Sequence, residues 1–352
     1  MNRIIFNPKL ILLMVVAFVF TASSLMAQPK IRGNVGYAFG TYSKTNEPGD
    51  DIEGFTFSLE NNLFFEGKVG DMDYRIRLRM RGIDRPEAAG DTNTVNDQEL
   101  QTVRGWARWN VSPTFNIRIT NMGTGPVAHV SENDPVQNLA CAGCRIGEIS
   151  DEPQIDFTFK NGGNQFGFYL SNEAPSGLHT TGNDGDSQKT GGSNALTTGV
   201  FGNLKFDGIN LLIFFITSSA DNDNNNDGKF DDFAGGATAF MVAVKAKVGD
   251  IKIAADFESG TSDLAVGEDE VDHIGVKISV AGLNAAIGVG TQLNGATKVE
   301  KEQQIIAVHY RIPVGKGAWI GPEFQQRTDS SDAVGSVDVT TQTLRFLMVA
   351  KF

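Results

Sequence analysis

The residues best suited to chemistry form a row of arginines in the segment DYRIRLRMRG, residues 73–82. The four arginines occupy every second position: Arg75, Arg77, Arg79 and Arg81. Successive side chains of a β-strand point to opposite faces, so in a strand these four share one face. A guanidinium stays protonated at physiological pH, and the row therefore predicts a permanently positive surface that attracts anions.

Two nearby segments extend this surface. Arg104 and Arg108 share parity with Trp106, and Arg118 shares parity with Asn116. If the three segments are adjacent strands, all seven guanidiniums lie on one patch of wall. Charged side chains that line a water-filled pore set its preference among ions.

A second chemical feature is the closely spaced pair Cys141 and Cys144. Such a pair can be a redox dithiol, a haem attachment site or a small disulfide. Haem attachment requires a histidine next, and Arg145 stands there instead. No thioredoxin-like βαβ pattern surrounds the pair, so we favour a disulfide that rigidifies a loop.

The segment DNDNNNDGKFDD, residues 221–232, is a candidate calcium loop. Oxygen-bearing side chains alternate around Gly228 as in the first part of an EF-hand loop. The candidate ligands are Asp223, Asn225, Asp227 and Asp231. Ala234 stands where an EF-hand has its closing glutamate, so a solvated acidic loop stays an open alternative.

Motifs of the common enzyme classes are absent from the sequence. There is no Gly-x-Ser-x-Gly elbow, no phosphate-binding Gly-Lys-Thr loop and no His-Glu-x-x-His zinc helix. The four histidines are scattered: His129, His179, His273 and His309. We expect no enzymatic activity and no required cofactor.

The elements that position the arginines are strands, because period-two alternation runs from about residue 30 to the end. In residues 274–280, for example, Ile274, Val276 and Ile278 alternate with Gly275 and Lys277. The connections alternate between short turns and long polar loops. The predicted turns are 70–72, 112–114, 162–164, 207–208, 249–250, 282–283 and 315–317, and the long loops include 85–97, 123–152, 173–193, 218–236 and 261–272. This pattern predicts an all-β, transmembrane antiparallel barrel of about sixteen strands, with short periplasmic turns and long extracellular loops.

The start of the chain predicts export. Arg3 and Lys9 precede the short apolar run at residues 10–20, and small residues lead to a cleavage site after Ala27. We therefore expect a signal peptide over residues 1–27 and a barrel over residues 28–352. The net charge of −12 argues against nucleic-acid binding.

The last segment, TQTLRFLMVAKF, places apolar residues at alternate positions that end on Phe352. This end resembles the recognition signal by which the barrel-assembly machinery binds bacterial outer-membrane proteins. With the pattern of turns and loops, the chain resembles the general, trimeric porins of Gram-negative outer membranes. The resemblance implies an outer-membrane location and a homotrimer surrounded by lipid.

In general porins the third long loop folds into the channel, and this resemblance makes residues 123–152 a candidate constriction loop. Its acidic residues are then candidates to face the arginines: Glu132, Asp134, Glu148, Asp151 and Glu152. The alternative is an external loop bound to its neighbours by salt bridges.

The direction of the arginine row follows from its cost in lipid. An arginine on the lipid face of a barrel costs about 2–4 kcal/mol at the midplane, so the arginines are expected to line the pore. We therefore expect a water-filled channel for passive diffusion of small hydrophilic solutes and ions, with a preference for anions. Two alternatives stay open: a channel selective for phosphate or other oxyanions, and a plugged barrel that acts as a structural protein or adhesin.

Overall fold

The computed structural model describes residues 29–46, 51–84, 99–120, 154–171, 193–222, 233–263, 268–295 and 297–352. All regular secondary structure in these ranges is β-strand. The predicted signal peptide (residues 1–27) lies outside the described residues. No helix in the described part of the chain is long and apolar enough to cross a membrane.

The strands follow one another along the chain with no other regular element between them. They are β1 (Lys30–Asn46), β2 (Ile52–Val69), β3 (Met72–Asp84), β4 (Glu99–Ser112), β5 (Phe115–Thr120), β6 (Gln154–Asn161), β7 (Asn164–Ser171), β8 (Ser193–Phe206), β9 (Ile209–Asn222), β10 (Phe233–Val248), β11 (Ile251–Asp263), β12 (Glu268–Val280), β13 (Leu283–Leu293), β14 (Glu300–Tyr310), β15 (Ile312–Gly315), β16 (Ala318–Ser331) and β17 (Val339–Lys351).

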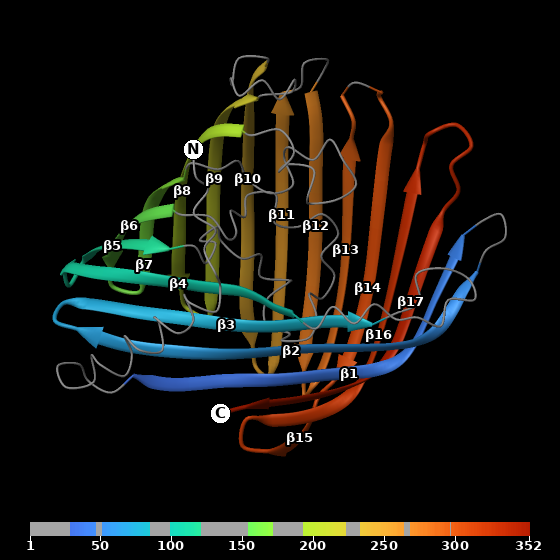
Figure 1. Cartoon of the computed structure of the whole chain (residues 1–352), viewed down its shortest axis with the longest axis horizontal. Helices are drawn as coiled ribbons and strands as arrows, with labels where there is room; N and C mark the ends of the chain where they lie inside the picture. The colour runs from blue at the N-terminus through green and yellow to red at the C-terminus, as the bar shows by residue number, and fades with distance from the viewer. Residues whose placement is uncertain are drawn as a thin grey trace, which may run out of the picture.

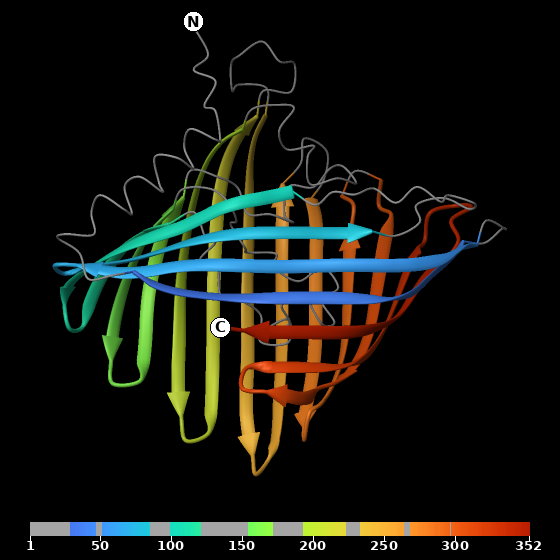
Figure 2. The ribbon, with the colours of Figure 1, turned by 60° about the horizontal axis from the view of Figure 1, so that its bottom comes forward.

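The strands form one antiparallel sheet that closes on itself (Figure 1, Figure 2). β1 pairs with both β2 and β17, which joins the two ends of the sheet. β15 continues β14 after Arg311, and both pair with β16, so the barrel has sixteen strands. The predicted fold class, an antiparallel barrel of about sixteen strands, is confirmed.

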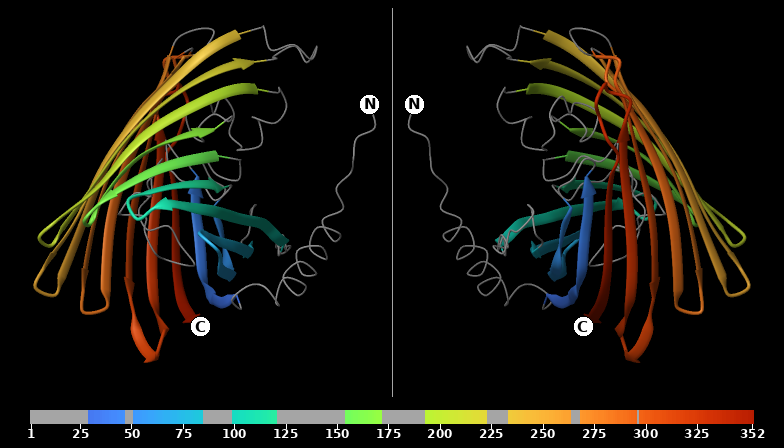
Figure 3. Two further views of the ribbon diagram at one scale, coloured as in Figure 1. Left: turned by 90° about the vertical axis from the view of Figure 1, so that its left-hand side faces the viewer. Right: turned by 90° about the vertical axis from the view of Figure 1, so that its right-hand side faces the viewer.

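Tight turns join the strands at one end of the barrel (Figure 3). The seven predicted turns are all present, and one of them is shifted by a residue. That turn consists of Ala281 and Gly282, with φ angles of 47° and 89°, and β13 begins at Leu283. A two-residue hairpin turn with positive φ at both positions matches the twist of the strands, which explains the shift.

Two hairpins extend further than the alternation predicts. β9 and β10 continue to Asn222 and from Phe233, inside the predicted loop 218–236. β11 and β12 continue to Asp263 and from Glu268, inside the predicted loop 261–272. The polar side chains there show no apolar alternation. Backbone pairing does not require one, so the strands continue beyond the apolar band of the barrel.

The barrel has an apolar outward face and a mostly polar inward face. On β12 the outward Ile274 and Ile278 are 55% and 46% exposed, whereas the inward His273 is 2% exposed. On β11 the inward Asp256 and Glu258 are each 2% exposed. The period-two pattern therefore assigns the two faces of these strands correctly.

One inward sector is apolar, which differs from the expected polar interior. Its nine buried side chains come from β7, β9, β10 and β12: Tyr169, Leu212, Phe214, Ile216, Ala237, Ala239, Met241, Ala243 and Val271. The rings of Tyr169 and Phe214 stack with centroids 5.8 Å apart. β9, β10 and β12, which carry all but one of these side chains, run behind β2 and β3 in Figure 1. The apolar sector therefore lies mainly on the side of the barrel opposite those two strands.

The barrel closes at the end of the chain. The backbone N–H groups of Gly33 and Phe352 each donate to the other's carbonyl oxygen, both at 3.0 Å. Leu344 and Met348 of β17 point outward and are 58% and 47% exposed, as the terminal alternation predicts. Arg345 points inward.

Candidate functional site: an arginine-rich inner wall

The first arginine-bearing strand, β3, directs its arginines toward the inside of the barrel. The side chains of Arg77 and Arg79 are each 17% exposed, whereas Met80, of the opposite parity, is 41% exposed. The strand can hold this arrangement because its outward positions carry the aromatic and aliphatic residues between the arginines. Arg81 also belongs to β3, but its side chain lies outside the described part of the structure.

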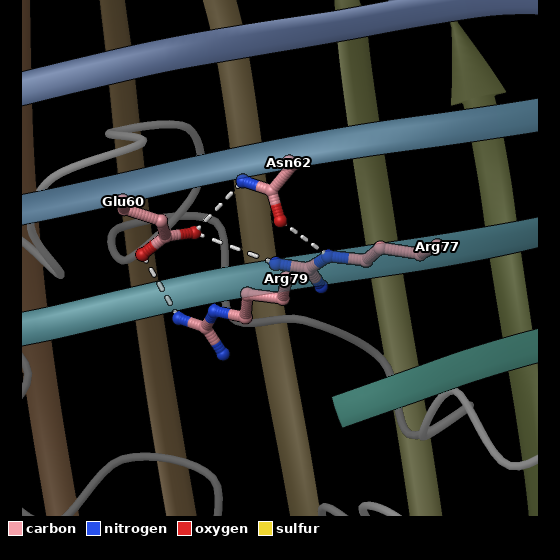
Figure 4. A network of polar contacts seen from close by, with 4 residues as sticks. All are labelled: Glu60, Asn62, Arg77 and Arg79. Atoms are coloured by element: carbon pink, nitrogen blue, oxygen red, sulfur yellow. Dashed lines mark hydrogen bonds and ion pairs between the residues drawn. The ribbon is translucent and has the colours of Figure 1, made fainter. Parts of the chain in front are cut away.

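Arg77 and Arg79 share a single carboxylate, that of Glu60 on β2 (Figure 4). An Nη2 atom of each arginine contacts Glu60, at 3.4 Å from Arg77 and 2.9 Å from Arg79. Asn62 accepts a hydrogen bond of 2.6 Å from Arg77 Nε and donates one of 3.2 Å to Glu60. The amide thus fixes the orientation of both partners of the ion pair.

Arg75 is held by a carboxylate and by two aromatic rings. Glu66 forms ion pairs with Arg75 and, at 3.5 Å, with Arg32 of β1. The Arg75 guanidinium lies 5.4 Å from the ring centroid of Phe64 and 5.9 Å from that of Trp106. Cation–π contacts of this kind hold a guanidinium without neutralising its charge.

The neighbouring strands β4 and β5 continue the wall. Arg104 lies opposite Arg77 in the register of β3 and β4. Arg108 donates to Asp73 at 2.7 Å and lies 5.2 Å from the ring centroid of Trp106. Arg118 Nε donates to the carboxylate of Asp156 on β6 at 2.6 Å. Three adjacent strands therefore carry one continuous row of guanidiniums.

We define the arginine wall as the arginines of β3, β4 and β5 whose side chains the structure describes: Arg75, Arg77, Arg79, Arg104, Arg108 and Arg118. Among the described residues, the carboxylates paired with it are Glu60, Glu66, Asp73 and Asp156. Within these residues, six positive charges face four negative charges, an excess of two before Arg32 is counted. The described part of the wall therefore carries more positive than negative charge.

Comparison with known proteins identifies the fold. No family model matches the sequence, and no curated protein matches it. Among solved structures, OprB of Pseudomonas putida is similar with a TM-score of 0.60 at 11% identity, covering 92% of this chain and 94% of that one. The channel DcaP of Acinetobacter baumannii has a TM-score of 0.58 at 15% identity, covering 92% and 97%. The anion-selective porin from Comamonas acidovorans has a TM-score of 0.54 at 11% identity, covering 92% and 100%. The chain has the fold of an outer-membrane porin.

The acidic residues of the third long loop, which we expected to face the arginine wall, lie outside the described residues, so that expectation stays a prediction. In this porin-type barrel, carboxylates of adjacent strands pair with the arginines, which the sequence analysis did not predict. The signal was in the sequence. A turn at Gly70 and Asp71 places Glu66 opposite Arg75, and the inward parity then continues to Glu60.

The remaining predicted sites of the porin-type barrel lie outside the described residues. They are the loop acids Glu132, Asp134, Glu148, Asp151 and Glu152, the cysteines Cys141 and Cys144, and the calcium ligands Asp223, Asn225, Asp227 and Asp231. Within the described ranges, no group of three or more histidine, cysteine or acidic side chains is arranged to hold a metal ion. The disulfide and the calcium site stay predictions.

Two further inward groups were not predicted as sites. Glu323 of β16 and Arg345 of β17 form a buried ion pair of 2.9 Å, and Arg345 also donates to the hydroxyl of Ser58 at 3.1 Å. His309 accepts a hydrogen bond of 2.8 Å from Arg311. The first group ties β17 to β2 across β1, next to the seam where the barrel closes.

Proposed function

We propose that the chain forms a water-filled channel in the outer membrane, through which small hydrophilic solutes and ions diffuse passively with a preference for anions. The observation that carries this proposal is the row of guanidiniums on the inner wall of a closed barrel, where they outnumber the carboxylates among the described residues. Diffusion of this kind involves no chemical change in the solute, so the proposal includes no catalytic step.

The two faces of the barrel support a membrane location. Each outward arginine would cost about 2–4 kcal/mol at the bilayer midplane, and the arginines of β3 avoid this cost by pointing inward. The outward face instead carries large apolar side chains such as Phe55, Val200 and Phe215, which are 80%, 55% and 47% exposed. Such exposure is unfavourable in water over so large an area and is favourable in lipid.

The wall acts on ions through its fixed charge. Alternate residues of one strand face are about 6.8 Å apart, close to the Debye length of about 8 Å at 0.15 M salt. Neighbouring guanidiniums such as Arg75 and Arg77 therefore act together on a passing anion. Because arginine keeps its proton at physiological pH, the preference is expected to persist across that range.

The proposal also covers export, assembly and the third long loop. Residues 1–27 direct export, and Phe352 is recognised by the barrel-assembly machinery. Three copies assemble in the membrane, and residues 123–152 narrow the channel, with a disulfide between Cys141 and Cys144. The support for these points is the resemblance of the sequence to the general porins.

Current through single channels in planar bilayers tests the proposal. The wild-type protein should give ohmic current and a zero-current potential that indicates anion preference in a salt gradient. Replacing Arg77, Arg79 and Arg108 together with glutamine should move that potential toward cations at 0.15 M salt. The movement should shrink at 1 M salt, where the Debye length is about 3 Å.

Two results would contradict the proposal. A plugged structural or adhesin barrel would give no ohmic current at all. An unchanged zero-current potential in the folded triple variant at low salt would show that the arginine wall does not control permeation. Heat-modifiable migration in electrophoresis identifies the folded barrel in both cases.

A further inference from the structure

A recess opens at the edge of the arginine wall, toward the end of the barrel that carries the tight turns, and two arginines of the wall line it. Its volume is about 230 Å³, and its lining includes the cationic side chains of Arg108, Arg118 and Lys160. Phe201 and Leu212 form an apolar part of the same lining. The recess is large enough for several water molecules or for a small organic acid.

The pairing of the strands explains why these side chains meet. Arg108 of β4 lies opposite Arg118 of β5, and Lys160 of β6 lies opposite Gln165 of β7. Asn203 of β8 lies opposite Leu212 of β9. These residues all have inward parity. The six adjacent strands β4 to β9 therefore present one row of lining side chains, which is cationic at the β4 end and apolar at the β9 end.

The charge of the row selects an occupant with one negative charge. Asp73 pairs with Arg108, and Asp156 pairs with Arg118. Lys160 has no carboxylate partner among the described residues. Among the described residues, three positive charges face two negative charges at the recess, a net charge of +1. A monoanion neutralises this charge, whereas a phosphate dianion would leave an uncompensated negative charge at the recess.

Hydrogen-bond donors beside the cations suit a carboxylate. The buried Nε of Arg108 has no hydrogen-bond partner within the described structure. Thr158 and the amides of Asn116 and Gln165 also line the recess. A carboxylate can accept several such hydrogen bonds at once, and charge-assisted hydrogen bonds are the stronger kind.

The apolar end of the row selects an apolar substituent. Leu212 belongs to the inward apolar sector, and Phe201 packs against that sector. An occupant with its carboxylate at Lys160 can place a hydrocarbon group on these side chains and remove it from water. A fully hydrophilic ion makes no use of that part of the lining.

We infer that the recess is a binding subsite for small monocarboxylates that carry an apolar group, an inference that rests on the proposed channel for access. The subsite gives the channel a preference within anions, because such acids are retained on the wall while chloride passes. Benzoate is a suitable probe of this class. Acetate lacks the apolar ring, benzyl alcohol lacks the negative charge, and inorganic phosphate lacks both the carboxylate and the apolar ring.

Two variants test the two ends of the recess. Lys160→Gln should raise the benzoate concentration for half-maximal binding about tenfold or more, since it removes a charge-assisted hydrogen bond. Leu212→Asn should raise it several-fold without weakening the binding of acetate. Lys252→Gln is the matched control, because Lys252 has inward parity on β11, lies near a tight turn and is absent from the recess.

The measurements are calorimetric titration of the detergent-folded barrel and benzoate block of single-channel current. We expect saturable benzoate binding that Lys160→Gln weakens and Lys252→Gln does not. Equal effects of the two lysine variants, or tighter binding of phosphate or benzyl alcohol than of benzoate, would overturn the inference. Calorimetry needs no current, so Lys160-dependent binding by a barrel that conducts nothing would refute the proposed channel and keep the subsite.

Discussion

Neutralising one carboxylate of the arginine wall should make the channel more selective for anions. Glu60→Gln keeps the size of the side chain and removes the only carboxylate that contacts both Arg77 and Arg79 in the described structure. The excess counted over the described residues of the wall would rise from two positive charges to three. Glutamine can still accept a hydrogen bond from either guanidinium, so the local geometry has a substitute for the lost ion pair.

The size of the effect follows from Coulomb's law with screening. For an ion about 8 Å from the altered charge at 0.15 M salt, the energy is about 0.2 kcal/mol at water's permittivity and about 0.8 kcal/mol at an effective value of 20. The altered charge stabilises an anion in the channel by this energy and destabilises a cation by the same amount. The anion-to-cation permeability ratio should therefore rise between about twofold and about 13-fold. At 1 M salt the same estimate falls below about 1.7-fold.

The zero-current potential of single channels in a salt gradient measures this ratio. Glu53→Gln is the matched control, because Glu53 also belongs to β2 but is exposed and has outward parity. The control should leave the potential unchanged. If folded Glu60→Gln channels match the control, or shift toward cations, the charge balance of the wall does not set the selectivity.

Three further predictions concern assembly and stability. Deleting Phe352 removes two backbone hydrogen bonds to Gly33, and the amount of heat-modifiable barrel in the membrane fraction should fall sharply; wild-type amounts would contradict the role of the terminus. Glu323→Ala leaves Arg345 without its carboxylate partner and should lower the free energy of unfolding by about 3–5 kcal/mol, measured by urea titration in detergent against the exposed Glu302→Ala. The two cysteines of the third long loop should react with a thiol reagent only after reduction; rapid labelling of the untreated folded protein would exclude the disulfide.

The fold could be predicted because the barrel depends on local features. Alternation assigns each residue of a strand to a face, and glycines in the tight turns mark where strands end. The hairpin at Gly70 and Asp71 is an example, since its two residues fix the register of all of β2 and β3. The ends of strands such as β9 at the long loops were less predictable. The polar residues there pair through their backbones, and their sequence shows no alternation of apolar and polar side chains.

The arginines of the site were predicted from the sequence. The carboxylates that pair with them were not predicted, although the sequence contains the information needed to do so. Arg77 and Glu60 are 17 residues apart in the sequence, and only the register of the hairpin brings them together. The apolar inward sector was not predictable in the same way. Phe214 and Ile216 lie in a continuous apolar run, residues 211–216, in which parity does not distinguish the inside from the outside.

The charge of the whole chain and the charge of the wall have opposite signs, and the wall is the relevant one for permeation. The net charge is −12, whereas the described residues of the arginine wall and its paired carboxylates sum to +2. A charge acts on an ion over about one Debye length, roughly 8 Å at physiological salt, so distant acidic residues contribute little at the wall. Acidic residues near the rim instead act on ions before entry, where they oppose anions. Selectivity should then depend on which group lies closest to the narrowest part of the ion's path, and removing rim acids should change the rate of anion entry more than the permeability ratio.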